Sequence, residues 1–309
     1  MSDQTQLSII IPFYNEEENI ELLFQALVPV LKGINQSWEI LFVDDGSRDR
    51  SFEVVKKLCM QDNSIRAISL SRNFGHQVAL TAGLQHATGN MVITMDADLQ
   101  HPPEVIPQLV EQFEKGFEIV NTRRIDSRET GYFKKQSSRL FYRFINRISD
   151  ISIAESSSDF RLMSRKALDA FLQFRERDRF TRGLVSWMGF RQTHVDYECP
   201  PRFAGKSKYT LRKMLHFAAD GITAFSAKPL RIASYMGVMV FLVGLAYALF
   251  AIIQHASGKT IPGWTSLLVT VLLLGGIQLL GLGIIGEYLA RIFNESKSRP
   301  LYFIKDQIN

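Results

Sequence analysis

Two long uncharged stretches near the carboxyl end of this 309-residue chain most constrain its fold. Ile232–Ile253 runs for 22 residues, and Trp264–Gly286 for 23 residues, without Asp, Glu, Lys or Arg. As helices rising about 1.5 Å per residue, each would be about 33–35 Å long, enough to cross a hydrocarbon core of roughly 30 Å. Helices of soluble proteins usually carry charge on the face that meets water. The pattern predicts a two-helix transmembrane hairpin, with a pair of buried core helices as the alternative.

Basic residues gather outside this hairpin rather than in its connector. The connector, 254–263, holds only the cation Lys259, whereas the outer flanks hold Lys228, Arg231, Arg291, Lys297 and Arg299. Because basic flanks remain cytoplasmic, we expect a multi-pass protein of the inner (plasma) membrane with both termini in the cytoplasm. The expected parts are a cytoplasmic domain (1–230), two helices (232–253 and 264–286) and a cytoplasmic tail (287–309). Glycines in the second helix would allow close helix packing, so a homo-oligomer is left open.

The region before the hairpin alternates short apolar runs with amphipathic stretches. The strand-like runs are Leu7–Pro12, Trp38–Val43, Ile65–Leu70, Met91–Met95 and Phe117–Asn121. The helical stretches between and after them are Glu16–Leu31, Arg50–Met60, Gly75–Ala87 and Glu104–Lys115. Nearly continuous apolar runs are typical of parallel strands that are covered on both faces. The alternation therefore predicts an α/β domain with a doubly wound, mostly parallel sheet.

Polar and acidic loops follow four successive strands of this predicted sheet. They begin with Asn15-Glu16, Asp44-Asp45, Arg72-Asn73 and Asp96-Ala97-Asp98. A single acidic residue after a strand often caps the next helix, but ligands of such sheets bind at the edge where all four loops gather. Asp96 and Asp98 can converge on one hard cation such as Mg²⁺ or Mn²⁺, and Gln100 could supply a further oxygen.

Other classes of site are disfavoured. No GxGxxG follows the first strand, so a dehydrogenase-type dinucleotide domain is not expected. None of the six histidines pairs at zinc-ligand spacing, and His76 is most simply a surface residue. The net charge of +5 is concentrated in 123–147, which holds eight Lys and Arg against two acidic residues. Because the rest of the chain is net acidic, a general nucleic-acid binder is disfavoured.

Six ordered motifs resemble those of one enzyme family. They are Ile11-Pro12-Phe13-Tyr14-Asn15-Glu16, Val43-Asp44-Asp45-Gly46-Ser47, Ser71-Arg72-Asn73-Phe74-Gly75, Asp96-Ala97-Asp98-Leu99-Gln100, Ser158-Asp159-Phe160-Arg161-Leu162-Met163 and Arg202-Phe203-Ala204-Gly205-Lys206-Ser207-Lys208-Tyr209. With the hairpin, they resemble the family-2 glycosyltransferases of the GT-A fold. Within that family the chain is most similar to polyprenyl-phosphate glycosyltransferases, which include bactoprenol glucosyltransferases and dolichyl-phosphate mannose synthases. The resemblance implies a GT-A Rossmann-like, mostly parallel sheet with amphipathic helices at the membrane interface.

The resemblance also implies where the sugar donor would bind. The residues expected to contact a nucleotide sugar, most simply a UDP-sugar, are Pro12, Tyr14, Glu16, Asp45, Arg72 and Asp96. Asp96, Asp98 and Gln100 would hold the Mg²⁺ or Mn²⁺ ion that bridges the donor diphosphate. Such an ion neutralises charge that develops on the leaving nucleoside diphosphate. Asp98 would therefore belong to the catalytic residues.

The acceptor is expected to be a polyprenyl phosphate that is held by cations at the bilayer surface. Stretches 132–148 and 211–228 mix apolar with basic residues, as do helices that lie on lipid headgroups. The candidate lipid-phosphate ligands are Arg128, Arg139, Arg202, Lys206 and Lys208. An ordinary solvated helix is the alternative for the first stretch.

Asp159 is implied as a second catalytic residue, beside the reacting centre. A general base is one role. A phosphate monoester has a second pKa of about 6 and is mostly deprotonated at neutral pH, so a base is not required. Asp159 could instead orient the sugar or an arginine such as Arg161.

The predicted function is inverting transfer of a single sugar, glucose from UDP-glucose, to a polyprenyl phosphate such as undecaprenyl phosphate. The QxxRW motif of processive polysaccharide synthases is absent from the sequence, which favours a single transfer. The alternatives are transfer of mannose, aminoarabinose or an N-acetylhexosamine to the same lipid class, or a non-catalytic membrane scaffold.

Overall fold

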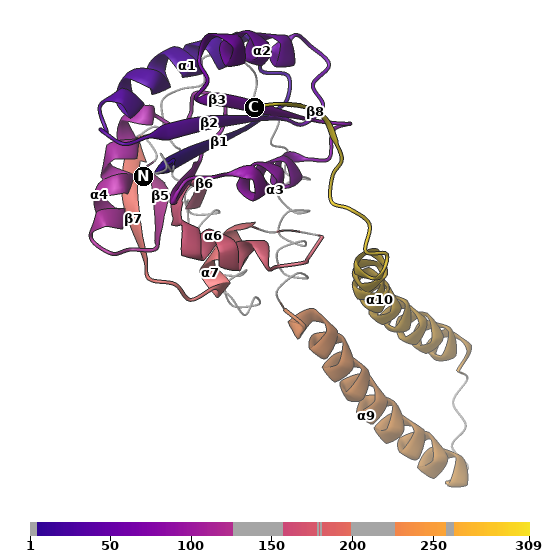
Figure 1. Ribbon diagram of the computed structural model, residues 1–309. Helices are drawn as coiled ribbons and strands as arrows, with labels where there is room; N and C mark the ends of the chain where they lie inside the picture. The colour runs from indigo at the N-terminus through magenta and orange to yellow at the C-terminus, as the bar shows by residue number, and fades with distance from the viewer. Residues whose placement is uncertain (1–4, 126–156, 178, 180, 199–225, 258–262) are drawn as a thin grey trace. The chain divides into compact units, whose positions relative to one another are not determined.

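The computed structural model, drawn in Figure 1, describes residues 5–125, 157–177, 179, 181–198, 226–257 and 263–309. The chain divides into two compact units. The first comprises Met1–Asn146, Ile151–Met214 and Arg299–Asn309, and the second comprises Arg147–Asp150 and Leu215–Ser298. The expected interfacial helix 132–148 and residues 211–225 of the expected interfacial helix 211–228 lie outside the described residues.

The first unit is built on one eight-stranded sheet. Its strands are β1 (Leu7–Phe13), β2 (Trp38–Asp44), β3 (Ile65–Leu70), β4 (Met91–Thr94), β5 (Ile119–Ile125), β6 (Ser157–Ser164), β7 (Gln192–Glu198) and β8 (Ile304–Ile308). The strand order is β7-β5-β6-β4-β1-β2-β3-β8. The four adjacent strands β4, β1, β2 and β3 are parallel to one another, whereas β6 runs antiparallel to both β4 and β5. The α/β fold that the sequence predicts is confirmed, as a mixed sheet with a parallel centre.

The order of the central strands places the site. The chain moves from β1 outward to β2 and β3, and then returns to form β4 on the other side of β1. Ligands of open α/β sheets bind beyond the carboxyl ends of the strands, where the order reverses in this way. The loops after β1 and β4 are therefore the first place to look for function.

Helices cover both faces of this sheet. They are α1 (Glu17–Lys32), α2 (Ser51–Gln61), α3 (His76–His86), the short 3₁₀ turn η1 (Pro103–Val105), α4 (Ile106–Glu114), α6 (Arg165–Leu172) and α7 (Thr181–Trp187). In Figure 1, α1 and α2 lie on one face of the central strands and α3 lies on the other. The packing follows from sequence spacing, because Ile20, Leu23, Leu27 and Leu31 recur every three or four residues along α1 and are fully buried.

The expected elements occur where the sequence places them, with one shifted strand. β1 to β4 and α1 to α4 coincide with predicted segments to within a few residues. The fifth strand, predicted as Phe117–Asn121, is Ile119–Ile125 and continues into exposed basic residues. That extension is held by pairing with β7 rather than by burial of its own side chains.

The second unit contains two long helices, α9 (Lys228–Ala256) and α10 (Trp264–Ser296). Both hold segments long and apolar enough to cross a membrane, Lys228–Gln254 with mean hydropathy 2.5 and Leu273–Ser296 with mean hydropathy 1.5. Neither apolar window is buried inside the described structure. The alternative of two buried core helices therefore does not hold for the residues that are described.

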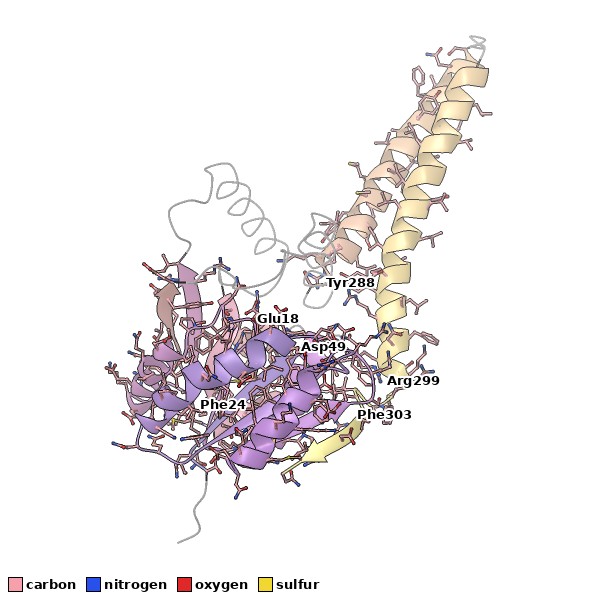
Figure 2. All side chains as sticks on the ribbon, turned by 90° about the horizontal axis from the view of Figure 1, so that it is seen from above. Glu18, Phe24, Asp49, Tyr288, Arg299 and Phe303 are labelled. Carbon is pink, nitrogen blue, oxygen red and sulfur yellow. The ribbon has the colours of Figure 1, made fainter. Side chains whose placement is uncertain are left out.

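The segment after α10 rejoins the first unit. The sequence leaves 287–309 as a tail, but α10 continues to Ser296 and Ile304–Ile308 forms strand β8. β8 pairs antiparallel with β3 at the edge of the sheet, in the register Ala67 with Ile308 and Leu70 with Ile304. Figure 2 labels Arg299 and Phe303 on the segment that leads into β8.

Candidate functional site

The loops after β1 and β2 are joined by hydrogen bonds between backbone and side chains. The amide of Asn15 donates to Ser47 Oγ at 3.0 Å, and the amide of Arg48 donates to Asn15 Oδ1 at 2.8 Å. The amide of Glu16 donates to Ser51 Oγ at 2.8 Å. Asn15 has a left-handed backbone with φ of 55°, which asparagine tolerates better than most residues. These bonds fix both turns at one edge of the sheet.

Asp45 fixes the loop after β3 against the loop after β2. Its buried carboxylate accepts hydrogen bonds from the amides of Phe74, at 2.7 Å, and Gly75, at 2.9 Å. Burial raises the pKa of Asp45, and these two bonds offset part of that rise. Gly46, with φ of 69°, lies so close that a Cβ atom there would sit 2.5 Å from the carbonyl carbon of Arg72. The sequence therefore needs glycine at this crossing of two loops.

The other expected donor-binding residues surround these turns. Pro12 is buried within β1, while Tyr14 is 37% exposed just beyond it. The carboxylate of Glu16 accepts a 2.6 Å hydrogen bond from the Asn19 side chain. Arg72 is exposed, and its guanidinium lies 4.3 Å from the centre of the Phe74 ring. All of these residues belong to the carboxyl edge of the sheet, as the sequence predicts.

The turn after β4 carries the paired aspartates. Asp96 and Asp98 are partly exposed, and the buried Ala97 separates them. Asp98 Oδ1 accepts a 3.2 Å hydrogen bond from the amide of Gln100. Leu99 has a left-handed backbone with φ of 61°, which is strained for a bulky side chain. Strain of this kind persists where the surroundings enforce it and is concentrated at functional sites.

The side chain of His101 holds this turn by hydrogen bonds. Its Nδ1 accepts a 2.8 Å hydrogen bond from the Asp96 amide, so the ring proton is on Nε2. Nε2 then donates to Ser158 Oγ at 2.8 Å and lies 3.7 Å from Asp96 Oδ2. The buried ring stacks on Phe160 with 5.0 Å between ring centres. His101 thus links the Asp96 turn to strand β6.

Asp159, on β6, is buried between two arginines. Arg182 donates from Nε to Oδ1 and from a terminal nitrogen to Oδ2, both at 3.2 Å. A terminal nitrogen of Arg161 lies 3.3 Å from Oδ1. Burial by itself would raise the pKa of Asp159, but the charges of Arg182 and Arg161 outweigh it and hold the pKa well below its ordinary value. A carboxylate held in this way is a weak proton acceptor.

The first turn of α3 joins the two acidic groups. His76 Nε2 lies 3.5 Å from Asp96 Oδ1 and 3.9 Å from Asp159 Oδ2. Gln77 Nε2 donates to Asp159 Oδ2 at 3.4 Å, and the hydroxyl of Thr181 donates to Gln77 Oε1. His76 is 43% exposed, as expected for a surface residue, but its ring lies between two candidate site carboxylates. Elements far apart in the chain therefore converge here.

The donor set fits a divalent cation that substrate phosphates would complete. Within the described residues, no group of three or more His, Cys, Asp or Glu side chains could hold a metal ion alone. Asp96 and Asp98 offer carboxylate oxygens at the carboxyl edge of the sheet. Mg²⁺ is commonly bound by one or two carboxylates together with substrate phosphates. The side chains present are compatible with a metal bound jointly with a donor diphosphate.

Some predicted site residues lie outside the described residues, and two residues of the site were not predicted. Arg128, Arg139, Arg202, Lys206 and Lys208 lie outside the described residues, so their contact with lipid phosphate stays a prediction. Conversely, His101 and Arg182 were not identified from the sequence. His101 follows Gln100 directly, and that adjacency could have indicated it. Arg182 lies in none of the six motifs, and its role depends on the packing of α7 against β6.

Two family models match this chain. Residues 8–172 match the model of "Glycosyl transferase family 2". Residues 228–292 match the model of the "GtrB C-terminal hairpin". The first match spans β1 to α6 and includes both aspartate motifs, and the second spans α9 and most of α10.

Individual known proteins are also similar to this chain, two of them over nearly its whole length. An uncharacterized glycosyltransferase of Bacillus subtilis, YkcC, is 45% identical over 99% of this chain and 95% of its own length. The bactoprenol glucosyl transferase of Shigella phage SfV is 39% identical over 98% of this chain and 99% of its own length. Glucosyl-3-phosphoglycerate synthase of Mycobacterium tuberculosis, solved with Mn²⁺ and UDP, is 17% identical with a TM-score of 0.46 and covers 71% of this chain and 78% of its own. That last likeness is too distant to assign residue roles.

Proposed function

The chain belongs to glycosyl transferase family 2 and carries the GtrB C-terminal hairpin, and from this premise we propose that it transfers glucose from UDP-glucose to a polyprenyl phosphate such as undecaprenyl phosphate. Near full-length likeness to a bactoprenol glucosyl transferase supports this choice of sugar and lipid. The structural observation that carries the proposal is the approach of Asp96 and Asp159 to the same ring nitrogen of His76, at the switch point of the sheet.

The donor would lie across the turns after β1, β2 and β3. Tyr14 is exposed for contact with the base, and Arg72 is exposed for contact with phosphate. Asp45 has both oxygens hydrogen-bonded to the loop after β3, so its proposed contribution to the nucleotide site is the shape of that loop. Pro12 and Glu16 complete the turn beside the nucleotide.

Asp96 and Asp98, with Gln100, would hold Mg²⁺ or Mn²⁺ beside the donor diphosphate. The bound ion would act as a Lewis acid that neutralises negative charge on the leaving nucleoside diphosphate. The residues of this chain would position the two carboxylates that hold the ion. His101 holds the backbone of Asp96, and the turn through Leu99 and Gln100 shapes the position of Asp98.

The reaction needs no base from the protein. An oxygen of the acceptor phosphate forms a bond to the anomeric carbon, while the bond from that carbon to the diphosphate breaks and its electron pair leaves with UDP. Displacement from the opposite face converts an α-linked donor into a β-linked lipid-phosphate sugar. The acceptor phosphate has a second pKa of about 6 and is therefore mostly dianionic at neutral pH.

We place the site on the cytoplasmic face of the inner membrane, anchored by α9 and α10. These helices lie between β7 and β8 in the chain, and both strands belong to the same sheet. Because a folded sheet does not straddle a bilayer, the connectivity supports an even number of crossings. The basic flanks of the hairpin support the cytoplasmic side.

A transfer assay tests the proposal directly. Full-length protein in vesicles that contain undecaprenyl phosphate would be incubated with radiolabelled UDP-glucose and Mg²⁺ or Mn²⁺. Label should move into butanol-extractable lipid, and EDTA should stop the transfer. A panel of UDP- and GDP-sugars identifies the sugar if glucose is not the one used. Absence of transfer from every donor, with folded protein in the membrane, would favour the non-catalytic scaffold.

A further inference from the structure

We propose that Arg182 binds a substrate phosphate at this site and that Asp159 is a positioning residue that acts through Arg182. The inference rests on the proposed transfer to a polyprenyl phosphate. Both the leaving diphosphate and the acceptor monoester present the same phosphate chemistry, and the experiment below separates them.

The contact between these residues has the geometry of a two-point clamp. Arg182 uses Nε and a terminal nitrogen on the two oxygens of Asp159, at 3.2 Å each. The planar guanidinium fork matches a carboxylate in this arrangement, so the second terminal nitrogen of Arg182 is the group that would meet a phosphate. A paired fork loses fewer rotamers when it binds a ligand, because its orientation is already set.

Charge and burial separate the roles of the two arginines. Asp159 carries one negative charge and contacts the positive charges of both Arg161 and Arg182. The Arg161 side chain is only 2% exposed and also donates to the Ser158 carbonyl, at 2.9 Å. The Arg182 side chain is 31% exposed. Arg161 therefore balances charge inside the protein, while Arg182 can present positive charge to a ligand.

The surrounding contacts direct Arg182 to the reaction site. Its neighbour Thr181 donates to Gln77, which in turn donates to Asp159, so the start of α7 is joined to the start of α3. His76 lies within 3.9 Å of Asp159 and 3.5 Å of Asp96. One ring nitrogen of His76 thus lies close both to the carboxylate that Arg182 contacts and to the carboxylate proposed to hold the donor cation.

The positioning role accounts for the carboxylate better than proton abstraction does. Both oxygens of Asp159 are engaged by arginines, and Gln77 adds a third partner. A base must present an oxygen to the acceptor, but the acceptor phosphate is already deprotonated. Loss of Asp159 would instead remove the carboxylate that orients Arg182 and that pairs with the buried Arg161.

A double-mutant cycle on the full-length protein in vesicles tests this coupling. Arg182→Gln should lower kcat/KM by about 100-fold, as expected for loss of one strong contact to transition-state charge. Asp159→Asn should cause a loss of similar size. If Asp159 acts only through Arg182, the double variant should be no worse than Arg182→Gln by more than a few-fold. Losses that multiply, to about 10,000-fold, would show that Asp159 acts independently and would overturn the proposal.

Two controls distinguish positioning from folding. Arg182→Lys keeps the charge but not the fork, so it should recover part of the lost turnover in a folded protein. Arg66→Gln removes another partly buried arginine, whose NH1 lies 2.8 Å from Glu39 near the start of β2. This variant should lose thermal stability while its KM and kcat remain near wild type. Equal losses of activity in Arg66→Gln and Arg182→Gln would reduce the role of Arg182 to general stability.

Binding measurements test, without the need for turnover, whether Arg182 binds a substrate phosphate. UDP with Mn²⁺ and farnesyl phosphate, a short polyprenyl monoester, would be titrated separately into each variant. Arg182→Gln should weaken one of the two ligands by at least about tenfold, and Asp159→Asn should weaken the same ligand. The affected ligand identifies which phosphate Arg182 binds. Unchanged binding of both ligands refutes the proposal, even if the wild type proves inactive and the proposed function fails.

Discussion

The backbone amide of Ser71 donates a 2.9 Å hydrogen bond to the carbonyl oxygen of Phe303, which joins the end of β3 to the segment beyond the second long helix. The hydroxyl of Tyr302 also donates to the side chain of Gln85, on α3. Ser71 begins the loop whose next residues include Arg72 and whose backbone is held by Asp45. The carboxyl-terminal segment therefore supports a candidate donor-binding loop.

The same segment also contacts the loop that leads to α7. The guanidinium of Arg177 donates to the carbonyls of Arg299 and Pro300. Figure 2 labels Arg299 near the beginning of this segment and Phe303 just before β8. The segment 299–303 thus contacts both the loop that carries Arg72 and the loop that leads to Arg182.

Deleting residues 302–309 should reduce both stability and transfer, because it removes the contacts of Tyr302 and Phe303 as well as β8. The deletion removes β8 and leaves the outer edge of β3 without its antiparallel partner. We expect the melting temperature to fall by several degrees, because the backbone bonds lost are worth about 1 kcal/mol each. The KM for the donor should rise more than the KM for the lipid, since the loop after β3 is affected most. Thermal melts and steady-state kinetics measure these effects.

Phe303→Ala provides the matched control for this deletion. The Phe303 side chain is 58% exposed, and the bond to Ser71 uses only the backbone carbonyl, which alanine retains. The variant should therefore resemble the wild type in both measurements. A deletion variant with an unchanged donor KM would contradict the supporting role of the segment.

Local sequence was sufficient for the parallel centre of the sheet and insufficient for its edges. All seven residues of β1 are buried, so its apolar run identifies it without knowledge of the rest of the fold. By contrast, β7 alternates buried and exposed residues only in part, and β8 is mostly exposed. These strands are defined by pairing with β5 and β3, which a local pattern does not reveal.

In the candidate site, too, some residues could be predicted from local sequence and others could not. Asp96 and Asp98 could be identified because both follow one buried strand within a single short motif. The contacts of Asp159 with Arg182 and His76 join residues from β6, α7 and α3. Their proximity depends on β6 inserting between β4 and β5, and the sequence alone predicts only a mostly parallel sheet. The positioning network therefore becomes visible only in the fold.

Asp98→Asn should separate metal use from folding. Removing one carboxylate charge from the proposed cation site should lower turnover by about 100-fold, since metal charge stabilisation is worth several kcal/mol. The concentration of Mn²⁺ or Mg²⁺ that gives half-maximal activity should rise. Asp62→Asn is the control, because the Asp62 carboxylate accepts the Ser64 amide before β3, away from the carboxyl edge. Near-normal turnover of Asp98→Asn at low metal concentration would argue against the assignment.

The acid limb of the pH–rate profile should follow the acceptor and not Asp159. The pKa of Asp159 is held below its ordinary value by Arg182 and Arg161, against the opposing effect of burial. A carboxyl group with a lowered pKa stabilises the fold above its unfolded pKa of about 3.9, and that stabilisation is lost as the pH falls toward the folded pKa. From pH 5 to pH 8 its charge should therefore remain constant, and kcat/KM should decline near pH 6 with the lipid phosphate.

Changing the acceptor tests this assignment. A polyprenyl phosphonate, whose second ionisation is weaker, should move the acid limb to higher pH. In every active variant, the pH of the acid limb should follow the second ionisation of the acceptor. A limb that remains fixed when the acceptor is changed would instead identify a titrating group of the protein.

Gly46→Ala should be more damaging than an equivalent change at Gly189. Both glycines have left-handed backbones, with φ of 69° and 70°. A Cβ atom at Gly189 would meet nothing within 4 Å, so alanine there should cost only the backbone strain of about 1–2 kcal/mol. At Gly46 the same atom would lie 2.5 Å from the backbone of Arg72, which forces the loops after β2 and β3 apart.

The difference between the two variants isolates the contact between the loops. Denaturant unfolding should show a larger loss of stability for Gly46→Ala than for Gly189→Ala. The donor KM should rise only in Gly46→Ala, because the displaced loop carries Arg72 and is held by Asp45. Equal effects of the two substitutions on stability and on KM would mean that the loop after β3 can shift without cost, and that its position does not govern donor binding.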